Sequence, residues 1–248
     1  MRIEHQYKLL CNTILYYGEA KSSRAGMVRS LFGKQIGADL EQEFPMLTGK
    51  KIYFEKARAE WMWMYQGKTD IRYLNDHGIK WWNPYANEEG DVGKVYGHQI
   101  RNFNDKIDQW TLCKEEIENN SRRALITFWN PVDEPWQSLP PCYSNFNFVR
   151  MGDKLNMVMN IRSSDVAVGL PYDMIIGAMA LHEMAVQTGL KPKYISYSLA
   201  DAHIYANNAV PLEEYLAAPM YKTPEYNPEF QTLGDYNSGP YIKMKMNV

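Results

Sequence analysis

One cysteine and one arginine carry the first chemical signal in this chain. Cys142 follows two prolines, which favour an extended backbone before it. A cysteine in such a place is most often a core residue. Arg162 lies in the run Arg162-Ser163-Ser164-Asp165, and a guanidinium can bind phosphate through two hydrogen bonds and lower the pKa of a nearby thiol. Each residue alone is a weak signal, but the pair favours a reactive thiol near an anion site.

Other polar residues are suited to the same substrate. Arg122 and Arg123 precede a predicted strand, where adjacent side chains point to opposite faces. Two such arginines usually form a solvated turn, but one of them can face inward or towards a partner. Arg24 lies in a loop with a nearby glycine, and a plain surface loop is the alternative. The run from Asp201 to Tyr205 places its polar members on one strand face, which suits a sugar hydroxyl or a structural hydrogen-bond network.

The composition limits the classes of function. The chain has 248 residues, of which 45% are hydrophobic, and these suffice for one compact domain over residues 1–248. The net charge of −2 gives no overall positive field for nucleic acid. The N-terminus lacks the pattern of a signal peptide, and no apolar run approaches the roughly 18 residues that span a bilayer. The three cysteines have no metal-ligand spacing, and their odd number favours a reducing cytoplasm.

The hydrophobic pattern predicts an α+β fold without repeats or linkers. Predicted helices cover 3–18, 53–66 and 174–188, and predicted strands cover 124–129, 155–161 and 194–199. Gly67 and Gly189 end the second and third helices. From Pro211 onward the pattern predicts only short strands.

Longer motifs stand in order along the whole chain. They are Ser23-Arg24-Ala25-Gly26, Phe44-Pro45-Met46-Leu47-Thr48, Glu60 with Gln66-Gly67, Ile79 with Trp82, Gly90-Asp91, Val95-Tyr96-Gly97, Ser121-Arg122-Arg123, Trp129-Asn130-Pro131, Pro141-Cys142, Arg162-Ser163-Ser164-Asp165, Gly169-Leu170-Pro171-Tyr172 and Asp201-Ala202-His203-Ile204-Tyr205. Together they resemble the thymidylate synthase family, and the run 242–248 is similar to that family's closing tail. The resemblance implies a mixed β-sheet packed by helices, with one sheet face forming a homodimer interface.

The resemblance also implies a reaction, the transfer of one carbon to C5 of a pyrimidine nucleotide. Cys142 would add to C6, which makes C5 nucleophilic towards the co-substrate, 5,10-methylenetetrahydrofolate. A water near Tyr96 would remove the C5 proton, and Glu60 would organise the water network and the proton transfers. Hydride from tetrahydrofolate then gives a methyl group, whereas water gives a hydroxymethyl group. No metal is expected.

The family pattern assigns binding roles to further residues. For the phosphate these are Arg24, Arg162 and Ser163, with Arg122 and Arg123 contributed by the other subunit. His203 and Tyr205 would bind the 3′-hydroxyl of the sugar. Within the folate site, Asp165 would bind the pterin and Lys50 would meet the glutamate tail. The full set of expected folate contacts is Lys50, Ile79, Trp82, Asp165, Gly169, Tyr172 and Val248.

The most informative departure from the family is Asp173, where asparagine is usual. An amide offers a donor and an acceptor, which complements O4 and N3–H of uracil. A carboxylate instead accepts from the amino group of cytosine and favours a protonated N3, which makes C6 more electrophilic. Aspartate at this position is similar to the phage deoxycytidylate hydroxymethylases of the same superfamily. The substrate is therefore predicted to be dCMP; neutral drift, or a protonated aspartate that still binds dUMP, is the alternative.

Three other departures surround the same base and folate. Tyr143 replaces a usual histidine, Ile161 a usual glutamine, and Tyr85 a common tryptophan. The tail at 242–248 keeps the family pattern that excludes water, which favours methylation over hydroxymethylation. The sequence therefore predicts a deoxycytidylate C5-methyltransferase, cytoplasmic and suited to a phage-infected bacterium. The alternatives are a dCMP hydroxymethylase, a dUMP thymidylate synthase, and a non-catalytic paralogue that binds nucleotide or RNA.

Overall fold

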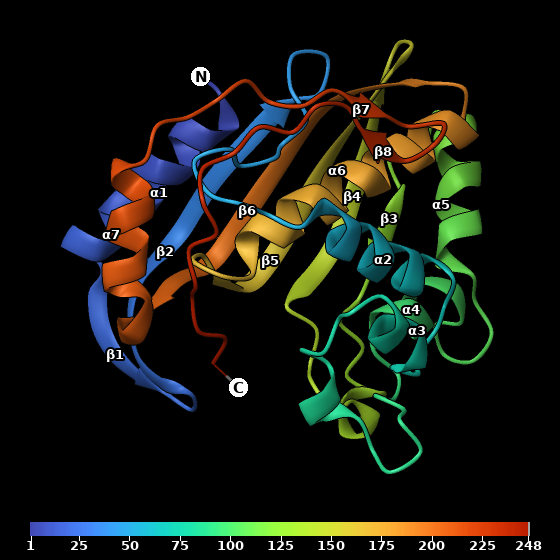
Figure 1. The fold of residues 1–248 in the computed structure, drawn as a ribbon. Helices are drawn as coiled ribbons and strands as arrows, with labels where there is room; N and C mark the ends of the chain where they lie inside the picture. Colours follow the sequence, from blue (N-terminus) through green and yellow to red (C-terminus); the bar gives the residue numbers. More distant parts are fainter. Residues whose placement is uncertain (248) are drawn as a thin grey trace.

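A six-stranded β-sheet forms the centre of the protein, whose computed structural model describes residues 1–247 (Figure 1). Its strands are β1 (Glu19–Ser23), β2 (Gly26–Asp39), β3 (Leu125–Thr127), β4 (Tyr143–Met151), β5 (Lys154–Asp165) and β6 (Lys191–Tyr205). They are ordered β1-β2-β6-β5-β4-β3. β5 and β6 are parallel, and the other neighbours are antiparallel. The predicted α+β class with a mixed sheet packed by helices is therefore confirmed.

Helices surround this sheet. They are α1 (Ile3–Tyr17), α2 (Phe54–Tyr65), α3 (Arg72–Asp76), α4 (Tyr96–Arg101), α5 (Gln109–Glu118), α6 (Leu170–Gln187) and α7 (Ala209–Ala217). Short 3-10 turns are η1 (Asn83–Tyr85), η2 (Glu134–Trp136) and η3 (Ala206–Asn208). A small hairpin joins β7 (Tyr226–Asn227) to β8 (Thr232–Leu233).

The central helix α6 lies across the sheet, with α2 beside it (Figure 1). It is apolar nearly all round, which is the pattern of a helix buried on most sides. Alternate residues of β5, from Leu155 to Ile161, are buried on the face that receives it. At Gly177 a side chain would come within 2.8 Å of the Met159 sulfur, so glycine permits this close approach. Because α6 packs on β5, the N-terminus of α6 lies beside the C-terminal end of β5.

Most predicted elements are confirmed with shifted ends. α1 and α2 match their predicted ranges to within a residue at each end, and the turn at Gly67 has φ +71°. α6 begins at Leu170, four residues earlier than predicted, because Pro171 lies in the first helical turn, where no intrahelical N–H bond is needed. β5 and β6 extend beyond their predicted apolar segments into polar residues, and β3 is shorter than predicted.

The prediction of only short strands after Pro211 is wrong. Pro211 lies in the first turn of α7, where its missing N–H costs no intrahelical hydrogen bond. Leu212 and Tyr215 are one helical turn apart, and both are fully buried. The Tyr215 hydroxyl donates to Glu4 at 3.0 Å and so ties α7 to α1.

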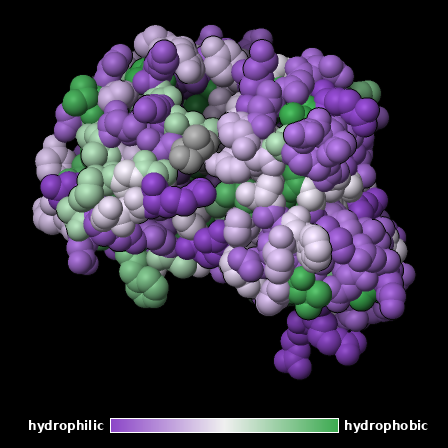
Figure 2. Space-filling model, turned by 90° about the horizontal axis from the view of Figure 1, so that it is seen from below, coloured by the Kyte–Doolittle hydropathy of each residue, from purple (hydrophilic) through white to green (hydrophobic). Residues whose placement is uncertain are grey.

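Two further observations concern partners. Helices long and apolar enough to cross a membrane are absent from residues 1–247, and so are clusters of His, Cys, Asp or Glu with metal-binding geometry. The face in Figure 2 is hydrophilic over most of its area, with small separate hydrophobic patches. That face therefore has the character of a surface in contact with water.

Candidate active site

Cys142 is held by its backbone at the start of β4, and its side chain is half-buried. Its N–H donates to the Tyr96 hydroxyl at 2.7 Å, and its carbonyl accepts from the Arg162 N–H at 2.9 Å. The Arg162 guanidinium donates to the carbonyls of Pro141 and Pro140 at 2.8 and 2.9 Å. These contacts fix the backbone of the segment on both sides of the thiol. Arg162 thus acts on Cys142 through its backbone as well as through its charge.

The pKa of the Cys142 thiol is raised in the ligand-free protein. Burial and the charge of Asp173 raise its pKa, whereas Arg162 and a hydrogen bond from Tyr96 lower it. Arg162 therefore lowers the thiol pKa, as predicted, but burial and Asp173 together raise it by more. Cys11 and Cys113 are more deeply buried, which raises the pKa of each to about 12. Of the three thiols, Cys142 is the one accessible to a ligand.

Asp173 lies in the first turn of α6 and shares this environment. Its Oδ1 accepts a hydrogen bond from the Tyr143 hydroxyl at 2.6 Å. Burial raises the pKa of Asp173 to about 7, with Glu60 and Asp165 acting in the same direction and Tyr143 opposing them. The second oxygen, Oδ2, lies on the side of Gly169, where an added methyl would be 3.7 Å from it.

The raised pKa of Asp173 predicts a pH-dependent stability. The carboxyl has a reference pKa of 3.8 and titrates at about 7 in the folded protein. Between these values the folded state holds a proton that the unfolded state has released, so the free energy of unfolding falls as pH rises through that window. Asp173→Asn removes this loss. Urea unfolding should show the variant gaining a few kcal/mol over the wild type between about pH 4 and about pH 7, and a constant difference contradicts the raised pKa.

Glu60 is a buried carboxylate on α2 that two indole rings hold in place. Its Oε1 accepts from Nε1 of Trp82 at 2.7 Å and from Nε1 of Trp81 at 3.0 Å. Burial raises the pKa of Glu60, and the two indole hydrogen bonds lower it. The sequence analysis singled out Trp82 alone. The tandem Trp81-Trp82 is the signal that was available for the second contact.

The predicted phosphate and sugar residues occupy the ends of β5 and β6. In their register Ser163 pairs with Asp201, and Asp165 pairs with His203. Nδ1 of His203 lies 3.5 Å from Oδ1 of Asp201, which confirms that these polar residues share a face. Burial raises the pKa of Tyr205, and the charge of Arg24 lowers it, so Arg24 lies near this end of the sheet.

Arg24 is exposed in the turn between β1 and β2. Arg162 stacks on Trp129, with its Cζ 5.0 Å from the ring centroid. Arg122 and Arg123 lie on an exposed loop between α5 and β3, where Arg123 pairs with Glu116 at 3.4 Å. Their assignment to a partner's phosphate site remains a prediction.

The predicted folate residues fall into two groups. The cleft at the start of α6 is lined by Gly169 and Tyr172, and Trp82 donates a hydrogen bond to Glu60. Asp165 accepts from the N–H groups of Ala167 and Val168 at 3.1 and 3.2 Å. Ile79 is fully buried, so its side chain lies in the core and not on a cavity wall. Val248 lies outside the described residues.

Lys50 is buried rather than open to solvent. Its Nζ donates to the Ala167 carbonyl at 3.0 Å and lies 3.4 Å from the Met244 sulfur. Burial lowers the pKa of Lys50 to about 8, and Cys11, Asp165 and Glu4 oppose this. The structure therefore places this ammonium beneath the C-terminal segment, and its contact with a glutamate tail remains a prediction.

A cleft of about 570 Å³ joins these residues, a volume typical of small-molecule sites. Glu60, Gly169 and Asp173 line it, with aromatic walls from Trp81 and Tyr172, whose ring centroids are 5.7 Å apart. The sequence did not single out several other lining residues, which are Tyr53, Lys56, Lys80, Trp81, Pro84, Val168 and Tyr241. Met244 and Met246 also line the cleft and belong to the predicted closing tail. These residues come from four separate segments, so their meeting depends on the tertiary fold.

The segment from Gly239 to Asn247 packs over this cleft. The Asn208 side chain donates to the Lys245 carbonyl at 2.8 Å and accepts from its N–H at 2.7 Å. Ile242 is buried, and Tyr241, Met244 and Met246 line the cleft. The tail is therefore docked in the ligand-free structure.

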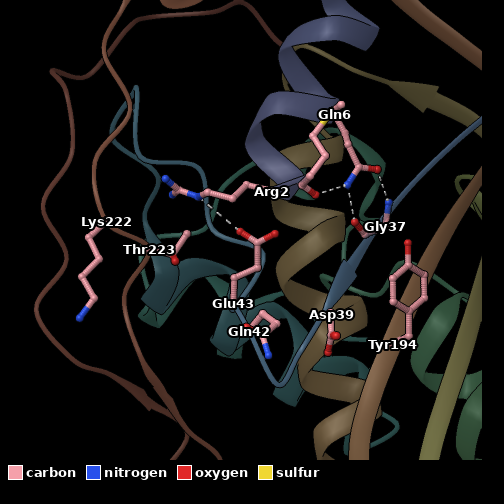
Figure 3. A pocket seen from close by; sticks show the side chains of 10 residues that line it. Arg2, Gln6, Gly37, Asp39, Gln42, Glu43, Tyr194, Lys222 and Thr223 are labelled. Carbon is pink, nitrogen blue, oxygen red and sulfur yellow. Dashed lines mark hydrogen bonds and ion pairs between the residues drawn. The ribbon is translucent and has the colours of Figure 1, made fainter.

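A larger cavity, of about 680 Å³, lies elsewhere, beside α1 and β2 (Figure 3). Its polar groups pair with one another: Gln6 donates to the Gly37 carbonyl at 2.8 Å, and Arg2 lies 3.7 Å from Glu43. The cleft at the start of α6 instead holds Asp173, whose charge acts on the Cys142 thiol, and it is therefore the better candidate for chemistry.

The cleft lies at the start of α6, and the Cys142 thiol lies close enough to Asp173 in its wall for that charge to raise the thiol pKa. A sequence profile described as thymidylate synthase matches residues 5–248. The chain belongs to the thymidylate synthase family. Membership implies a one-carbon transferase that acts on a nucleotide, with methylenetetrahydrofolate as co-substrate, and it confirms the family-level resemblance found in the motifs.

Proposed function

We propose that this protein methylates dCMP at C5, with Cys142 as nucleophile and 5,10-methylenetetrahydrofolate as carbon donor. The observation that carries the proposal is the buried carboxyl of Asp173, close enough to Cys142 for its charge to raise the pKa of the thiol. A carboxylate at the position that meets C4 accepts from the amino group of cytosine and repels O4 of uracil. Asp173 therefore selects the base that Cys142 attacks.

The residues around Cys142 are suited to a covalent addition. The Cys142 thiol loses its proton to water, the thiolate forms a bond to C6, and the electron pair of the C5–C6 double bond moves to C5. C5 then bonds to the donated carbon as one bond between that carbon and a folate nitrogen breaks. The C5 proton leaves to a water near Tyr96, while Glu60 orders the water network, and the second bond between the carbon and folate breaks to leave an exocyclic methylene. Hydride from tetrahydrofolate adds to this methylene, the bond between sulfur and C6 breaks, and Cys142 is restored with dihydrofolate as the second product. Burial raises the pKa of Tyr96, so its hydroxyl stays protonated and can donate.

Nucleotide binding follows from the polar ends of β5 and β6. Arg162, Ser163 and Arg24 would hold the phosphate, and His203 and Tyr205 the 3′-hydroxyl. The buried Nδ1 of His203 has no hydrogen-bond partner among the described residues, which suits a group that awaits a ligand. A dianionic phosphate near Arg162 would neutralise the positive charge of the guanidinium, which donates to the carbonyls of Pro140 and Pro141.

The cleft fits the co-substrate, which supplies the carbon and, for methylation, a hydride. A flat pterin matches the walls formed by Trp81 and Tyr172, beside the carboxyl groups of Glu60 and Asp173. Lys56 and Lys80 line the same cleft and are better placed than the buried Lys50 to meet the carboxylates of the glutamate tail.

The docked tail supports methyl as the product. Asn208→Ala removes two hydrogen bonds to Lys245, each worth about 1 kcal/mol, and so increases the undocked population roughly tenfold or more. Water then competes with hydride, so the hydroxymethyl share of the product, measured by mass spectrometry, should rise several-fold. Asn12→Ala is the control, because the Asn12 side chain donates to the Lys8 carbonyl within α1 and makes no hydrogen bond to the described residues of the tail. An unchanged product ratio in both variants contradicts a role for the docked tail.

The exposed sheet face is the proposed homodimer surface. Asn156, Val158 and Asn160 alternate with the buried residues of β5 and so point away from α6. The exposed apolar side chain of Val149, which pairs with Asn156, lies on the same face. A second copy would cover them and bring Arg122 and Arg123 to the partner's phosphate. A monomer by analytical ultracentrifugation under assay conditions contradicts this arrangement.

The test of the function is a comparison of kcat/KM for dCMP and dUMP with the same folate, with products identified by mass spectrometry. We expect dCMP to be preferred and 5-methyl-dCMP to form with dihydrofolate, a precursor for modified DNA in the cytoplasm of a phage-infected bacterium. Preference for dUMP makes the protein a thymidylate synthase. Hydroxymethyl-dCMP makes it a hydroxymethylase, and nucleotide binding without turnover makes it a binding paralogue.

A further inference from the structure

Tyr143 is the direct neighbour of Asp173 in the site and has no assigned role. Its side chain is 3% exposed and packs against Tyr96 and Phe128, with ring centroids 4.9 and 5.8 Å away. Its hydroxyl donates to Oδ1 of Asp173 at 2.6 Å, the length of a hydrogen bond to an ionised acceptor. Such packing fixes both the ring and the direction of the hydroxyl.

The two carboxyl oxygens of Asp173 consequently differ. Oδ1 faces the buried Tyr143, whereas Oδ2 lies on the side of Gly169, which lines the cleft. We propose that Tyr143 determines base preference by holding Oδ1 as an acceptor, so that Oδ2 alone meets the exocyclic group at C4 of the pyrimidine. This inference rests on the proposed function, because it assumes a pyrimidine beside Asp173.

The proton on Asp173 then decides which base fits. Oδ1 is occupied by the Tyr143 donor, so a proton bound by the carboxyl must sit on Oδ2. Ionised Asp173 presents Oδ2 as an acceptor, which matches the amino group of cytosine, and protonated Asp173 presents a donor, which matches O4 of uracil. By favouring the ionised form, Tyr143 favours cytosine.

The groups around Asp173 raise or lower the pKa of its carboxyl. The titratable groups that interact with Asp173 come from every neighbouring element, and they are Glu60, Tyr96, Cys142, Tyr143, Asp165 and Tyr197. Glu60 and Asp165 raise the pKa of Asp173 and the Tyr143 hydrogen bond lowers it, while burial remains the largest cause of its raised value. Removing the hydroxyl therefore moves the titration of Asp173 to higher pH.

The test is Tyr143→Phe, with Tyr197→Phe as the matched control. Tyr197 is also buried and donates to the Met174 carbonyl at 2.6 Å, one residue from Asp173, without touching its carboxyl. The readout is the ratio of kcat/KM for dCMP to kcat/KM for dUMP as a function of pH. The wild-type ratio should rise with pH. In Tyr143→Phe the ratio near neutral pH should fall about tenfold or more and its rise should move to higher pH, since the variant lacks the hydrogen bond that favours the ionised carboxyl.

Two outcomes separate this inference from the proposed function. The role of Tyr143 is overturned if Tyr143→Phe lowers kcat/KM equally for dCMP and dUMP and leaves the pH dependence of their ratio unchanged. Preference of the wild type for dUMP at every pH overturns the base assignment instead. In that case the effect of Tyr143 on Asp173 is still read without ligand. The pH-dependent loss of unfolding free energy begins at the unfolded-state pKa in every variant, so Tyr143→Phe should extend this loss to a higher pH, and Tyr197→Phe should not. A loss that ends at the same pH in Tyr143→Phe as in the wild type overturns the inference.

Discussion

Asp173→Asn is expected to reverse the base preference of the enzyme. In the variant the amide oxygen can keep the hydrogen bond from Tyr143, which turns the amide nitrogen towards the cleft. That nitrogen donates to O4 of uracil and opposes the amino group of cytosine. Because mismatched buried polar groups discriminate by about 10⁴-fold, the ratio of kcat/KM for dCMP to that for dUMP should fall on that order. Steady-state rates with both nucleotides measure it.

Asp165→Asn is the matched control for this experiment. Asp165 is also buried near Cys142, but its Oδ1 accepts from the backbone at Ala167 and Val168. Its replacement should weaken folate binding and reduce the rate with both bases alike. A base ratio that is unchanged in Asp173→Asn, or that changes equally in both variants, removes the pairing argument.

Cys142→Ser is expected to abolish turnover while leaving nucleotide binding in place. An alcohol is a far weaker nucleophile at neutral pH than a thiol, and loss of a covalent nucleophile lowers kcat by at least about 10⁴-fold. The backbone hydrogen bonds of residue 142 to Tyr96 and Arg162 do not involve the sulfur, so the segment should keep its position. Single-turnover rates and calorimetric dCMP binding measure the two effects separately.

Cys113→Ser provides the comparison, because Cys113 is a buried thiol on α5 outside the cleft. Its activity per folded molecule should stay near that of the wild type. Normal turnover by Cys142→Ser removes covalent catalysis from the account. Loss of dCMP binding in that variant assigns Cys142 a structural role instead.

The fold could be predicted where local pattern decides it. α1 has a regular apolar stripe, and Gly67 provides the left-handed turn that ends the α2 region, so both follow from short-range rules. The start of α6 and the whole of α7 were missed because prolines within a helical first turn resemble helix breakers. The polar ends of β5 and β6 were missed because sheet neighbours, not their own hydropathy, make them strands.

The candidate site could be predicted residue by residue but not as a set of contacts. Asp173 and Tyr143 were both recognised as departures from the family, yet their hydrogen bond joins positions 30 residues apart. Trp81 was overlooked because its bond to Glu60 depends on the packing of α2 against a loop. Lys50 was expected to meet the glutamate tail, and only the tertiary structure shows Met244 and Ala167 around its ammonium.

The central claim is that this enzyme activates C5 of dCMP through Cys142 with help from folate. Release of tritium from C5-labelled dCMP into water, compared with C5-labelled dUMP at equal concentrations, tests it most directly. The account predicts release that needs both methylenetetrahydrofolate and Cys142 and that is faster from dCMP. Faster release from dUMP, or none from dCMP in the presence of folate, contradicts it.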